Sequence, residues 1–314
     1  MKKIKYLSLL LTWKCNSKCK MCGIWKKERK DDELTLEEVK RIFIQPPFRG
    51  LKEVIISGGE PFLRKDLIEI IETIFHLTHS SIGITTNGFL SSSIYFTVKK
   101  AIKEKIPLKI YISLDGSNPQ IHDKIRGIRG AFNNTLYTIK TLTKLQEKYK
   151  FELDVGTTVT RENINDILNI RKLLYSFKEK LGYGIRIAEN AEYFFNLPQK
   201  FLYTEKEKKL LLDILEELKD GNIDFYYNAI KMFLLKNTYP KFRCTALSKS
   251  VYITPNGIVA PCSKYLNSCK IGDLRKQTMA EILIKSIEYN EKIKKCSGCL
   301  DPCQWSWAKN KLAI

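Results

Sequence analysis

The stretch Thr-Trp-Lys-Cys-Asn-Ser-Lys-Cys-Lys-Met-Cys-Gly, residues 12–23, directly follows the apolar run Lys5–Leu11. It gathers Cys15, Cys19 and Cys22, with no fourth cysteine or histidine nearby. A structural zinc site closes with four protein ligands, so three thiolates leave such a site incomplete. Iron–sulfur clusters are also held by cysteine thiolates, and a cluster with three of them keeps one iron open to a non-protein group. We therefore expect a loop after the first strand to hold a metal centre with an open position.

Length, apolar content and cysteine number narrow the class of protein. A chain of 314 residues with 44% hydrophobic residues can bury the core of one large domain and a smaller one. No apolar run reaches the length of a membrane span, and Ile4–Leu11 is too short for a signal peptide. We predict a cytoplasmic protein in which the nine cysteines, an odd number, serve metal binding and not disulfides.

The chain is strongly basic, with 54 Lys and Arg against 34 Asp and Glu and a formal charge of +20. Such a charge suits an anionic partner such as a nucleic acid, an acidic peptide or a phosphorylated metabolite. It also suits lysines that are solvated on helix faces. The lysines are scattered and no zinc-finger or RNP-like motif accompanies them, so the second interpretation is favoured and nucleic acid is not the expected partner.

Residues 1–195 alternate short apolar runs with helical patterns. The predicted strands are Lys5–Leu11, Glu53–Ser57, Ser81–Thr86, Leu108–Leu114, Leu153–Thr160 and Gly184–Ala188. The predicted helices are Thr35–Ile44, Arg64–His76, Ser91–Lys105, Asn133–Lys148 and Asn163–Lys180. The first helix opens with a capping box from Thr35 to Glu38. Strands separated by helices pair in parallel, so the predicted fold class is α/β, a partial (β/α)6 barrel with ligands at the carboxyl ends of its strands.

The pattern changes after the predicted barrel. Residues 196–240 are predicted to be a helical linker, with helices at Thr204–Lys219 and Asp224–Lys236. Residues 241–314 are predicted to form a small cysteine-rich α+β domain. In this domain Pro255-Asn256-Gly257 separates Ser250–Thr254 from Ile258–Ala260 and indicates a hairpin, because Asn-Gly supplies the positive φ angles of a tight turn. A further helix is expected at Thr278–Ile287.

The second predicted strand ends in Ser-Gly-Gly-Glu-Pro, residues 57–61. Gly58 and Gly59 allow a close approach between the backbone and a ligand. Glu60 can accept hydrogen bonds from an ammonium group. Taken alone, the same residues also fit an ordinary turn from a strand to a helix.

Polar side chains also occupy the ends of the third and fourth predicted strands. Asn87 follows the third strand, and Ser113 and Asp115 share one face at the end of the fourth. An Asn-Gly turn and an Asp cap explain Asn87 and Asp115 equally well. The run His-Asp-Lys-Ile-Arg-Gly, residues 122–127, comes next, and the guanidinium fork of Arg126 can pair with a carboxylate. We expect a structural role for His122.

The spacing Cys-x3-Cys-x2-Cys after an apolar strand resembles the signature of the radical S-adenosylmethionine (SAM) enzymes. In that family the amino and carboxylate groups of SAM occupy the open iron of a [4Fe–4S] cluster. An electron from the cluster then splits SAM into methionine and a 5′-deoxyadenosyl radical. The family usually has an aromatic residue before the third cysteine, where this chain has Met21.

The resemblance also implies roles for the residues at the strand ends. It assigns the Gly-Gly-Glu loop to the amino group of SAM and Arg126 to its carboxylate. It implies that Asn87 faces the cofactor, and that Ser113 and Asp115 contact the ribose or carboxylate of SAM. The residues expected to border the adenosine or the substrate are Thr158, Asn163 and Glu189.

A second group of cysteines lies near the carboxyl end of the chain. Twelve residues separate Cys244 from Gly257, and four separate Gly257 from Cys262. After a gap, the pair Cys296-x2-Cys299 follows. This order resembles the SPASM and twitch domains, which are carboxy-terminal modules of radical SAM enzymes that hold auxiliary [4Fe–4S] clusters. The resemblance implies one auxiliary cluster on these four cysteines. A zinc ribbon with four cysteine ligands has a similar outline and is the alternative.

The other cysteines leave the number of auxiliary clusters open. Six cysteines outside the first loop fit one fully ligated cluster with two spare thiols, or two clusters with open irons. Cys303 could replace one of the four ligands. Cys269 or Cys303 could also donate a hydrogen atom, as some radical epimerases require. The alternative for Cys269 is an idle thiol.

Together these features predict a radical SAM oxidoreductase or maturase that takes hydrogen from a substrate at the barrel mouth. The expected substrate is a peptide or protein that becomes cross-linked, epimerised or dehydrogenated, because the His-Asp-x-x-Arg-Gly segment is similar to one in peptide-modifying members. The alternative is a small anionic sugar or nucleotide cofactor precursor. The expected electron donor is of the flavodoxin or ferredoxin type. The alternative from another class is a zinc-stabilised nucleic-acid-binding protein.

Overall fold

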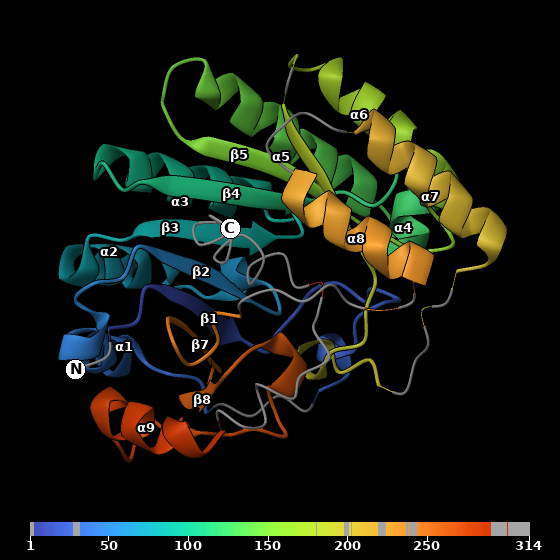
Figure 1. Ribbon diagram of the computed structural model, residues 1–314. Coiled ribbons are helices and arrows are strands. Elements are labelled where there is room, and N and C mark those ends of the chain that lie inside the picture. The colour runs from blue at the N-terminus through green and yellow to red at the C-terminus, as the bar shows by residue number, and fades with distance from the viewer. Residues whose placement is uncertain are drawn as a thin grey trace.

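A computed structural model describes residues 3–27, 32–179, 181–197, 201, 203–218, 224–236, 238, 244–289 and 300. Within this part of the chain, one sheet of nine strands has the order β6-β5-β4-β3-β2-β1-β7-β8-β9 (Figure 1). From β1 to β6, each strand lies beside the next one along the chain. The sheet is open, because β6 and β9 are its two edges. This architecture confirms the predicted α/β class with a partial barrel.

The first six strands pair in parallel throughout, as the alternation with helices predicts. Their bounds are β1 Tyr6–Thr12, β2 Glu53–Gly58, β3 Ser81–Thr86, β4 Leu108–Ser113, β5 Glu152–Val159 and β6 Gly182–Ile187. Every predicted strand is confirmed to within two residues at each end. The register between β1 and β2 shifts between Leu10 and Thr12, where β1 leaves the ladder and the first cysteine loop begins.

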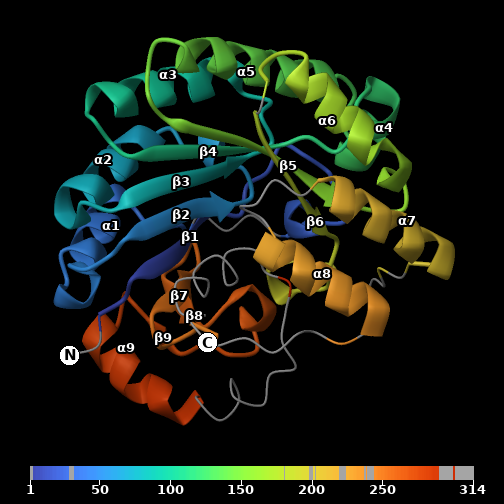
Figure 2. The same cartoon turned by 45° about the horizontal axis from the view of Figure 1, so that its top comes forward.

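The helices between these strands are α1 Leu36–Phe43, α2 Leu67–Thr78, α3 Ser91–Lys103, α4 Pro119–Arg126, α5 Ala131–Gln146 and α6 Ile167–Tyr175. They lie along the outside of the curved sheet (Figure 2). The predicted capping box is confirmed, with reciprocal hydrogen bonds between Thr35 and Glu38. Helix α4 is an addition to the predicted helices. Its signals are Asn118, whose side chain caps it, and Pro119 at its first position.

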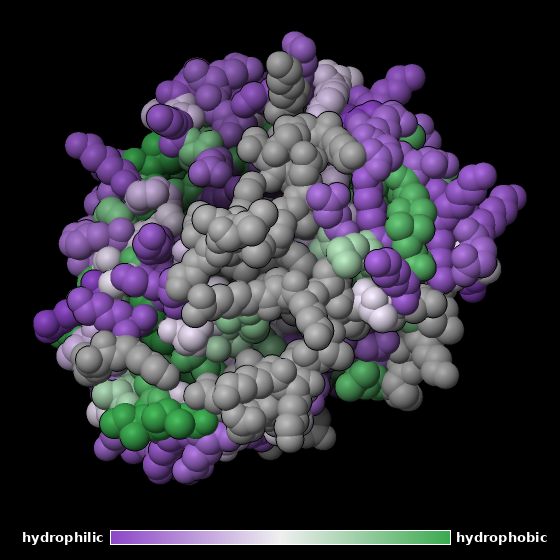
Figure 3. Space-filling model, in the orientation of Figure 1, coloured by the Kyte–Doolittle hydropathy of each residue, from purple (hydrophilic) through white to green (hydrophobic). Residues whose placement is uncertain are grey.

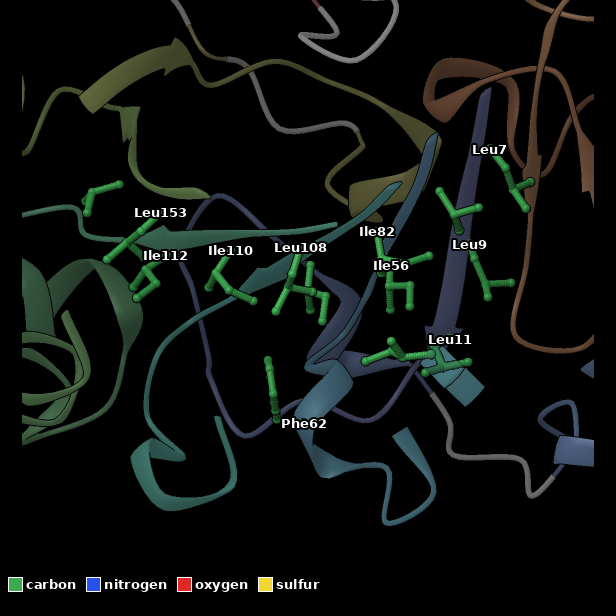
Figure 4. Close-up of a cluster of buried hydrophobic side chains, with 14 of the residues drawn as sticks. Leu7, Leu9, Leu11, Ile56, Phe62, Ile82, Leu108, Ile110, Ile112 and Leu153 are labelled. Carbon is green, nitrogen blue, oxygen red and sulfur yellow. The ribbon is translucent and has the colours of Figure 1, made fainter. Parts of the chain in front are cut away.

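The main hydrophobic core lies between the outer face of the sheet and the helices. Alternate strand residues point into it, as the period of a strand requires. Figure 4 shows part of this cluster, in which Leu9, Ile56 and Ile110 are fully buried. Each buried side chain of this size stabilises the fold by about 1.5–3 kcal/mol. The core thereby fixes the carboxyl ends of the strands, from which the predicted site residues project.

The opposite, concave face of the sheet is more polar and less filled. Near the amino ends of the strands, the Lys109 ammonium lies 2.9 Å from carboxylate oxygens of both Glu152 and Asp154. Further along β5, a Cβ atom built on Gly156 would have no neighbour within 4 Å among the described residues. The described part of the chain therefore leaves space in front of the middle of β5.

The carboxy-terminal region continues the same sheet. Strand β7 (Ser250–Ile253) lies parallel to β1, and β8 (Ile258–Ala260) and β9 (Gly272–Asp273) follow in antiparallel pairs. The predicted hairpin between β7 and β8 is confirmed, and Gly257 in its turn has a φ of +84°. The other helices are α7 Glu205–Glu217, α8 Asp224–Lys236 and α9 Met279–Lys285. The domain boundaries near residues 195 and 240 stay predictions.

Around the grey region of Figure 3, the coloured surface carries mainly hydrophilic side chains, with a few apolar patches between them. The most exposed large apolar side chains include Ile284 and Leu235, at 69% and 68%. Within the described residues, each helix is too short or too polar to cross a membrane.

Candidate functional site

The first cysteine loop, residues 13–23, starts at the carboxyl end of β1 and is fastened to the end of α4. The backbone N–H groups of Lys18 and Lys20 donate to the carbonyl oxygens of Arg126 and Ile125, each at 2.9 Å. Within the loop, the N–H of Cys22 donates to the carbonyl of Cys19 at 3.2 Å. The loop is therefore held from both sides at the edge of the sheet where ligands of α/β proteins bind.

The three thiols of this loop lie in a partly buried environment. Cys19 is buried, and Cys15 and Cys22 are half-buried. Burial raises the pKa of the Cys15 thiol to about 11 and that of Cys22 to about 12, and nearby negative groups add to the effect. Such thiols stay protonated at neutral pH unless a cation replaces the proton. Metal coordination does this, because a coordinating thiol is deprotonated outright.

Three cysteine thiols in one loop are a donor set for an iron–sulfur cluster with one open iron. Among the described residues, no three Cys, His, Asp or Glu side chains converge on a position for one metal ion. A [4Fe–4S] cluster does not need such convergence, because each thiolate binds a different iron. The donor set of Cys15, Cys19 and Cys22 therefore fits an iron–sulfur cluster.

The glycine loop after β2 packs directly on the start of the cysteine loop. The N–H of Gly59 donates to the Thr12 carbonyl at 2.7 Å, and the N–H of Glu60 donates to the Lys14 carbonyl at 2.8 Å. A Cβ atom on Gly59 would lie 2.2 Å from the Lys14 oxygen, and Gly58 has a φ of +121°. The close backbone approach that the sequence predicts is thus made, in this structure, to the cysteine loop.

The Glu60 side chain points inward and ties the glycine loop to the end of β3. Its carboxylate accepts from Thr86 Oγ1 at 2.8 Å, the Asn87 N–H at 2.8 Å and the Phe62 N–H at 3.2 Å. Burial raises the pKa of this carboxyl to about 7, against the opposing effect of these donors. The predicted contact of this carboxylate with an ammonium group stays a prediction, and its observed partners are internal.

Asn87 links the third strand to the cysteine loop. Its Nδ2 donates to Asn16 Oδ1 at 2.7 Å, and its Oδ1 accepts from the Phe89 N–H at 3.0 Å. Because Asn16 directly follows Cys15, the residue predicted to face the cofactor lies beside the predicted metal ligands. The second hydrogen bond turns the chain at the end of β3.

Asp115 and Arg126 form a buried ion pair beside the cysteine loop. Arg126 Nη2 lies 2.8 Å from Asp115 Oδ2, and Arg126 Nη1 lies 3.5 Å from Cys19 Sγ. Asp115 is 0% exposed and Arg126 is 7% exposed. Burial raises the pKa of Asp115, and the Arg126 charge opposes this shift. The structure thus brings together three residues that the sequence predicts for one site.

Asp115 is fixed by its neighbours as well as by Arg126. Its N–H donates to His122 Nδ1 at 3.0 Å, its carbonyl accepts from Asn163 Nδ2 at 3.0 Å, and its Oδ1 accepts from the Thr158 N–H at 2.8 Å. Burial, with a smaller contribution from the Arg126 charge, lowers the pKa of His122 to about 2, so the imidazole is neutral. His122 therefore has the structural role that the sequence predicts.

Ser113 lies on the concave face at the end of β4, opposite Gly156 of β5. It is half-buried. The open space in front of Gly156 begins beside this hydroxyl. Ser113 therefore lies where a ligand could contact it.

One carboxy-terminal cysteine, Cys262, lies against the same apolar cluster as a cysteine of the first loop. Cys22 of the first loop and Cys262, which follows β8, pack against one apolar cluster. Its buried members are Tyr6, Leu10, Trp13, Ile24, Ile55, Tyr252, Ala260 and Leu266. We call this group the shared apolar cluster. Cys244 is half-buried, and its Sγ accepts from the Ala246 N–H at 3.4 Å.

Three predicted residues of the second cysteine group, Cys296, Cys299 and Cys303, lie outside the described residues. Leu300 is described, and its N–H donates to Glu189 Oε2 at 3.3 Å while its carbonyl accepts from Tyr226 at 3.0 Å. Glu189, predicted to border the substrate, thus contacts the carboxy-terminal region. Cys269 is 1% exposed and packs in the main hydrophobic core, and its proposed role as a hydrogen donor stays a prediction.

The segment 190–196 after β6 is part of the site, and no motif in the sequence predicts it. Tyr193 in this segment bonds to Gly58, and the Phe194 carbonyl accepts from the Gly23 N–H at 2.6 Å. The run Tyr-Phe-Phe at 193–195 is the signal that could have drawn attention to it, because it follows a strand end.

Family comparisons identify the class of protein. The Radical SAM superfamily model matches residues 9–173, and an iron–sulfur cluster-binding domain model, SPASM, matches residues 244–304. The chain belongs to the radical SAM superfamily and carries a SPASM domain. These domains imply SAM, a [4Fe–4S] cluster and auxiliary iron–sulfur clusters as cofactors.

Two curated relatives show the range of this similarity. The chain is 31% identical over 160 residues to the AdoMet-dependent heme synthase of Methanosarcina barkeri, covering 50% of this chain and 43% of the relative. It is 25% identical over 276 residues to AlbA of Bacillus subtilis, an antilisterial bacteriocin subtilosin biosynthesis protein, covering 84% of this chain and 56% of the relative. The chain therefore spans about half the length of these relatives.

A solved structure shares the fold over nearly the whole chain. Streptococcus suis SuiB, bound to its precursor peptide SuiA, has a TM-score of 0.67 and 17% sequence identity. The match covers 90% of this chain and 65% of SuiB. At this level of identity, the likeness establishes the fold of the barrel and of the region that follows it.

Proposed function

We propose that this radical SAM enzyme is an oxidoreductase or maturase that modifies a peptide or protein by removing hydrogen, leaving the substrate cross-linked, epimerised or dehydrogenated. The observation that carries this proposal is the shared apolar cluster, against which Cys22 and Cys262 both pack. A substrate held beside the shared apolar cluster would lie within reach of both cysteine regions. The bacteriocin pathway of AlbA and the precursor peptide of SuiB support a peptide as the substrate.

The proposed metal ligands fall into two groups. Cys15, Cys19 and Cys22 would hold the first cluster. The four proposed ligands of an auxiliary cluster are Cys244, Cys262, Cys296 and Cys299. The gathering of three thiols, one buried and two half-buried, in one loop at the carboxyl end of β1 supports the first assignment. The approach of Cys262 to the barrel supports the second.

The proposed SAM site lies between the glycine loop and the buried ion pair. Peptide groups of Gly58 and Gly59, with Glu60 and Asn87 behind them, would receive the amino group of SAM. The proposed contacts with the ribose and carboxylate are Ser113, Asp115 and Arg126. The contacts of Gly59, Glu60, Asn87 and Arg126 with the first cysteine loop support the assignment, and Asp115 is paired with Arg126.

When bound, the cluster and SAM together supply the radical that takes hydrogen from the substrate. The chain itself contributes position, charge and exclusion of water. Arg126, oriented by Asp115, keeps a positive charge 3.5 Å from Cys19, which offsets the charge of the thiolates. The buried Glu60 fixes the spacing between the glycine loop and β3. A substrate at the concave face would have to fill the space there, because such a radical attacks any group it meets.

Anaerobic reconstitution tests this proposal. About eight irons per chain would support two [4Fe–4S] clusters, about four would remove the auxiliary cluster, and stoichiometric zinc would revive the nucleic-acid-binding alternative. The reduced protein should form 5′-deoxyadenosine, and replacing Cys15, Cys19 and Cys22 with alanine should abolish it. Persistent SAM cleavage in that variant would contradict the assignment of the first cluster.

We also propose the class of electron donor and a cytoplasmic location. A flavodoxin- or ferredoxin-type protein in the cytoplasm would reduce the first cluster. A short peptide encoded near this chain is the substrate to try first. Its mass should fall by two hydrogens on cross-linking or dehydrogenation and stay unchanged on epimerisation, which incorporates one deuterium from heavy water.

A second candidate substrate is a small anionic molecule such as a cofactor precursor. The formal charge of +20 and the similarity to a heme synthase favour it. Turnover of a nucleotide or sugar without turnover of any encoded peptide would replace the first proposal with this one.

A further inference from the structure

The segment 190–196, which we call the strap, follows the last strand of the barrel, β6, and packs against the first cysteine loop. Asn196 Nδ2 donates to the carbonyl oxygens of Met21 and Glu189, both at 3.0 Å. The rings of Phe195 and Trp13 meet edge to face, with centroids 5.3 Å apart. A Cβ atom on Gly23 would lie 2.2 Å from the Phe195 carbonyl oxygen. The strap therefore packs against the cysteine loop without space for a side chain between them.

Tyr193, in the 3₁₀ turn of the strap (η5, Glu192–Phe194), reaches across to the glycine loop. Its hydroxyl donates to the Gly58 carbonyl at 3.0 Å and accepts from the Gly58 N–H at 3.2 Å. The Tyr193 side chain therefore fixes both the N–H and the carbonyl of Gly58, the last residue of β2. Burial raises the pKa of Tyr193 to about 12, so the hydroxyl keeps its proton at any working pH.

The strap is also anchored on its other side. Glu192 Oε2 accepts from the N–H groups of Asn267 and Ser268, at 2.6 and 2.8 Å. These two residues lie in the loop between Cys262 and Cys269. With the cysteine loop, the glycine loop and this carboxy-terminal loop all bonded to it, the strap gives Tyr193 a rigid base.

We propose that Tyr193 is a positioning residue for SAM, because it holds the peptide groups of Gly58 and Gly59 in the orientation that receives the amino group of SAM. This inference rests on the SAM site given under the proposed function. Loss of the hydroxyl would leave both Gly58 groups without this partner. Leaving a buried polar group without its hydrogen bond is unfavourable, and part of this cost would appear as weaker binding of SAM.

The test is Tyr193→Phe in the reconstituted, reduced protein, titrated with SAM and followed by the electron paramagnetic resonance of the first cluster. We expect the Kd for SAM to rise about tenfold, which corresponds to about 1.4 kcal/mol, with unchanged iron per chain. The control is Tyr227→Phe. The Tyr227 side chain is fully buried, whereas Tyr193 is half-buried, and its hydroxyl likewise accepts from a backbone N–H, that of Ile185 at 3.2 Å, away from the glycine loop. This control should keep the Kd of the wild type.

The outcomes separate this inference from the function on which it rests. A wild-type protein whose spectrum does not respond to SAM would overturn the proposed site and this inference together. A normal wild-type response with equal Kd values in the wild type and Tyr193→Phe would overturn only the role of Tyr193. A loss of iron in Tyr193→Phe but not in Tyr227→Phe would also overturn it, because the hydroxyl would then support the cluster loop and not SAM.

Discussion

Two glycines of the barrel, Gly59 and Gly156, have opposite surroundings. Gly59 has the Lys14 carbonyl oxygen where a Cβ atom would be, at 2.2 Å. Gly156 has no atom of the described residues within 4 Å of that position. A methyl group at Gly59 must therefore move backbone, whereas one at Gly156 enters open space.

We expect Gly59→Ala to lower the free energy of unfolding by about 1–3 kcal/mol, the usual cost of overpacking, and to lower the iron content after reconstitution. Gly156→Ala should be neutral or stabilise slightly, because alanine loses less backbone entropy in a strand. Urea unfolding of the two variants measures the difference. Equal losses of stability would contradict the packing of the glycine loop on the cysteine loop.

The buried pair of Asp115 and Arg126 gives a second prediction. Arg126→Met removes the charge that neutralises a fully buried carboxylate, which typically costs about 3–5 kcal/mol. Adding Asp115→Asn removes the stranded charge, so the double variant should recover part of the lost stability. Urea unfolding of the wild type, both single variants and the double variant gives the coupling. Additive losses would show that the two groups do not interact.

The sequence predicts the position of these residues better than the direction of their side chains. Cys15, Asn87, Asp115 and Arg126 do come together, because parallel strands bring their carboxyl ends to one edge. The inward turn of Glu60 depends on donors from another strand, which no local pattern contains. The hydrogen bonds of Tyr193 join residues 135 positions apart, so they are equally invisible in the sequence.

At the scale of elements, Arg275 in the loop after β9 joins the carboxy-terminal region to the start of α1. Its Nε and Nη2 donate to the two carboxylate oxygens of Glu38, at 2.7 and 3.1 Å. This bond is the main reason that the pKa of Glu38 falls to about 2. Glu38 also completes the capping box of α1, so one carboxylate serves two elements.

We expect Arg275→Gln to lower the free energy of unfolding by about 1 kcal/mol near pH 6, since the pair is bidentate but partly exposed. The Glu38 carboxyl has a lower pKa in the folded chain, so its contribution is complete above pH 4.5 and disappears as the pH falls toward 2. The difference between wild type and variant should shrink over that range.

Urea unfolding at several pH values measures this change. Lys276→Gln is the control, because Lys276 is 81% exposed and lies 3.8 Å from Asp273. It should change stability little at any pH. A difference between the wild type and Arg275→Gln that stays constant from pH 6 to pH 2 would show that Glu38 is not the partner that matters.

At the scale of the whole molecule, the alternation of strands and helices predicts the barrel, but it gives no sign of how the cysteine-rich region attaches. The structure joins them through one sheet, with β7 parallel to β1 and Leu7 opposite Val251. Such pairing connects residues more than two hundred positions apart, and a local pattern carries no information on it. The region predicted as a separate small domain is therefore also a wall of the barrel.

This attachment predicts that the barrel does not fold well alone. Removing residues 244–314 would expose the backbone edge of β1 and uncover apolar side chains, and such an edge promotes aggregation. We expect the shortened chain to aggregate, as measured by size-exclusion chromatography. The point variant Val251→Asp should act in the same direction, because it buries a charge on β7 in a fully buried position, whereas Ser248→Asp at an exposed position should not. A monomeric shortened chain with cooperative unfolding would show that β1 does not need its carboxy-terminal neighbour.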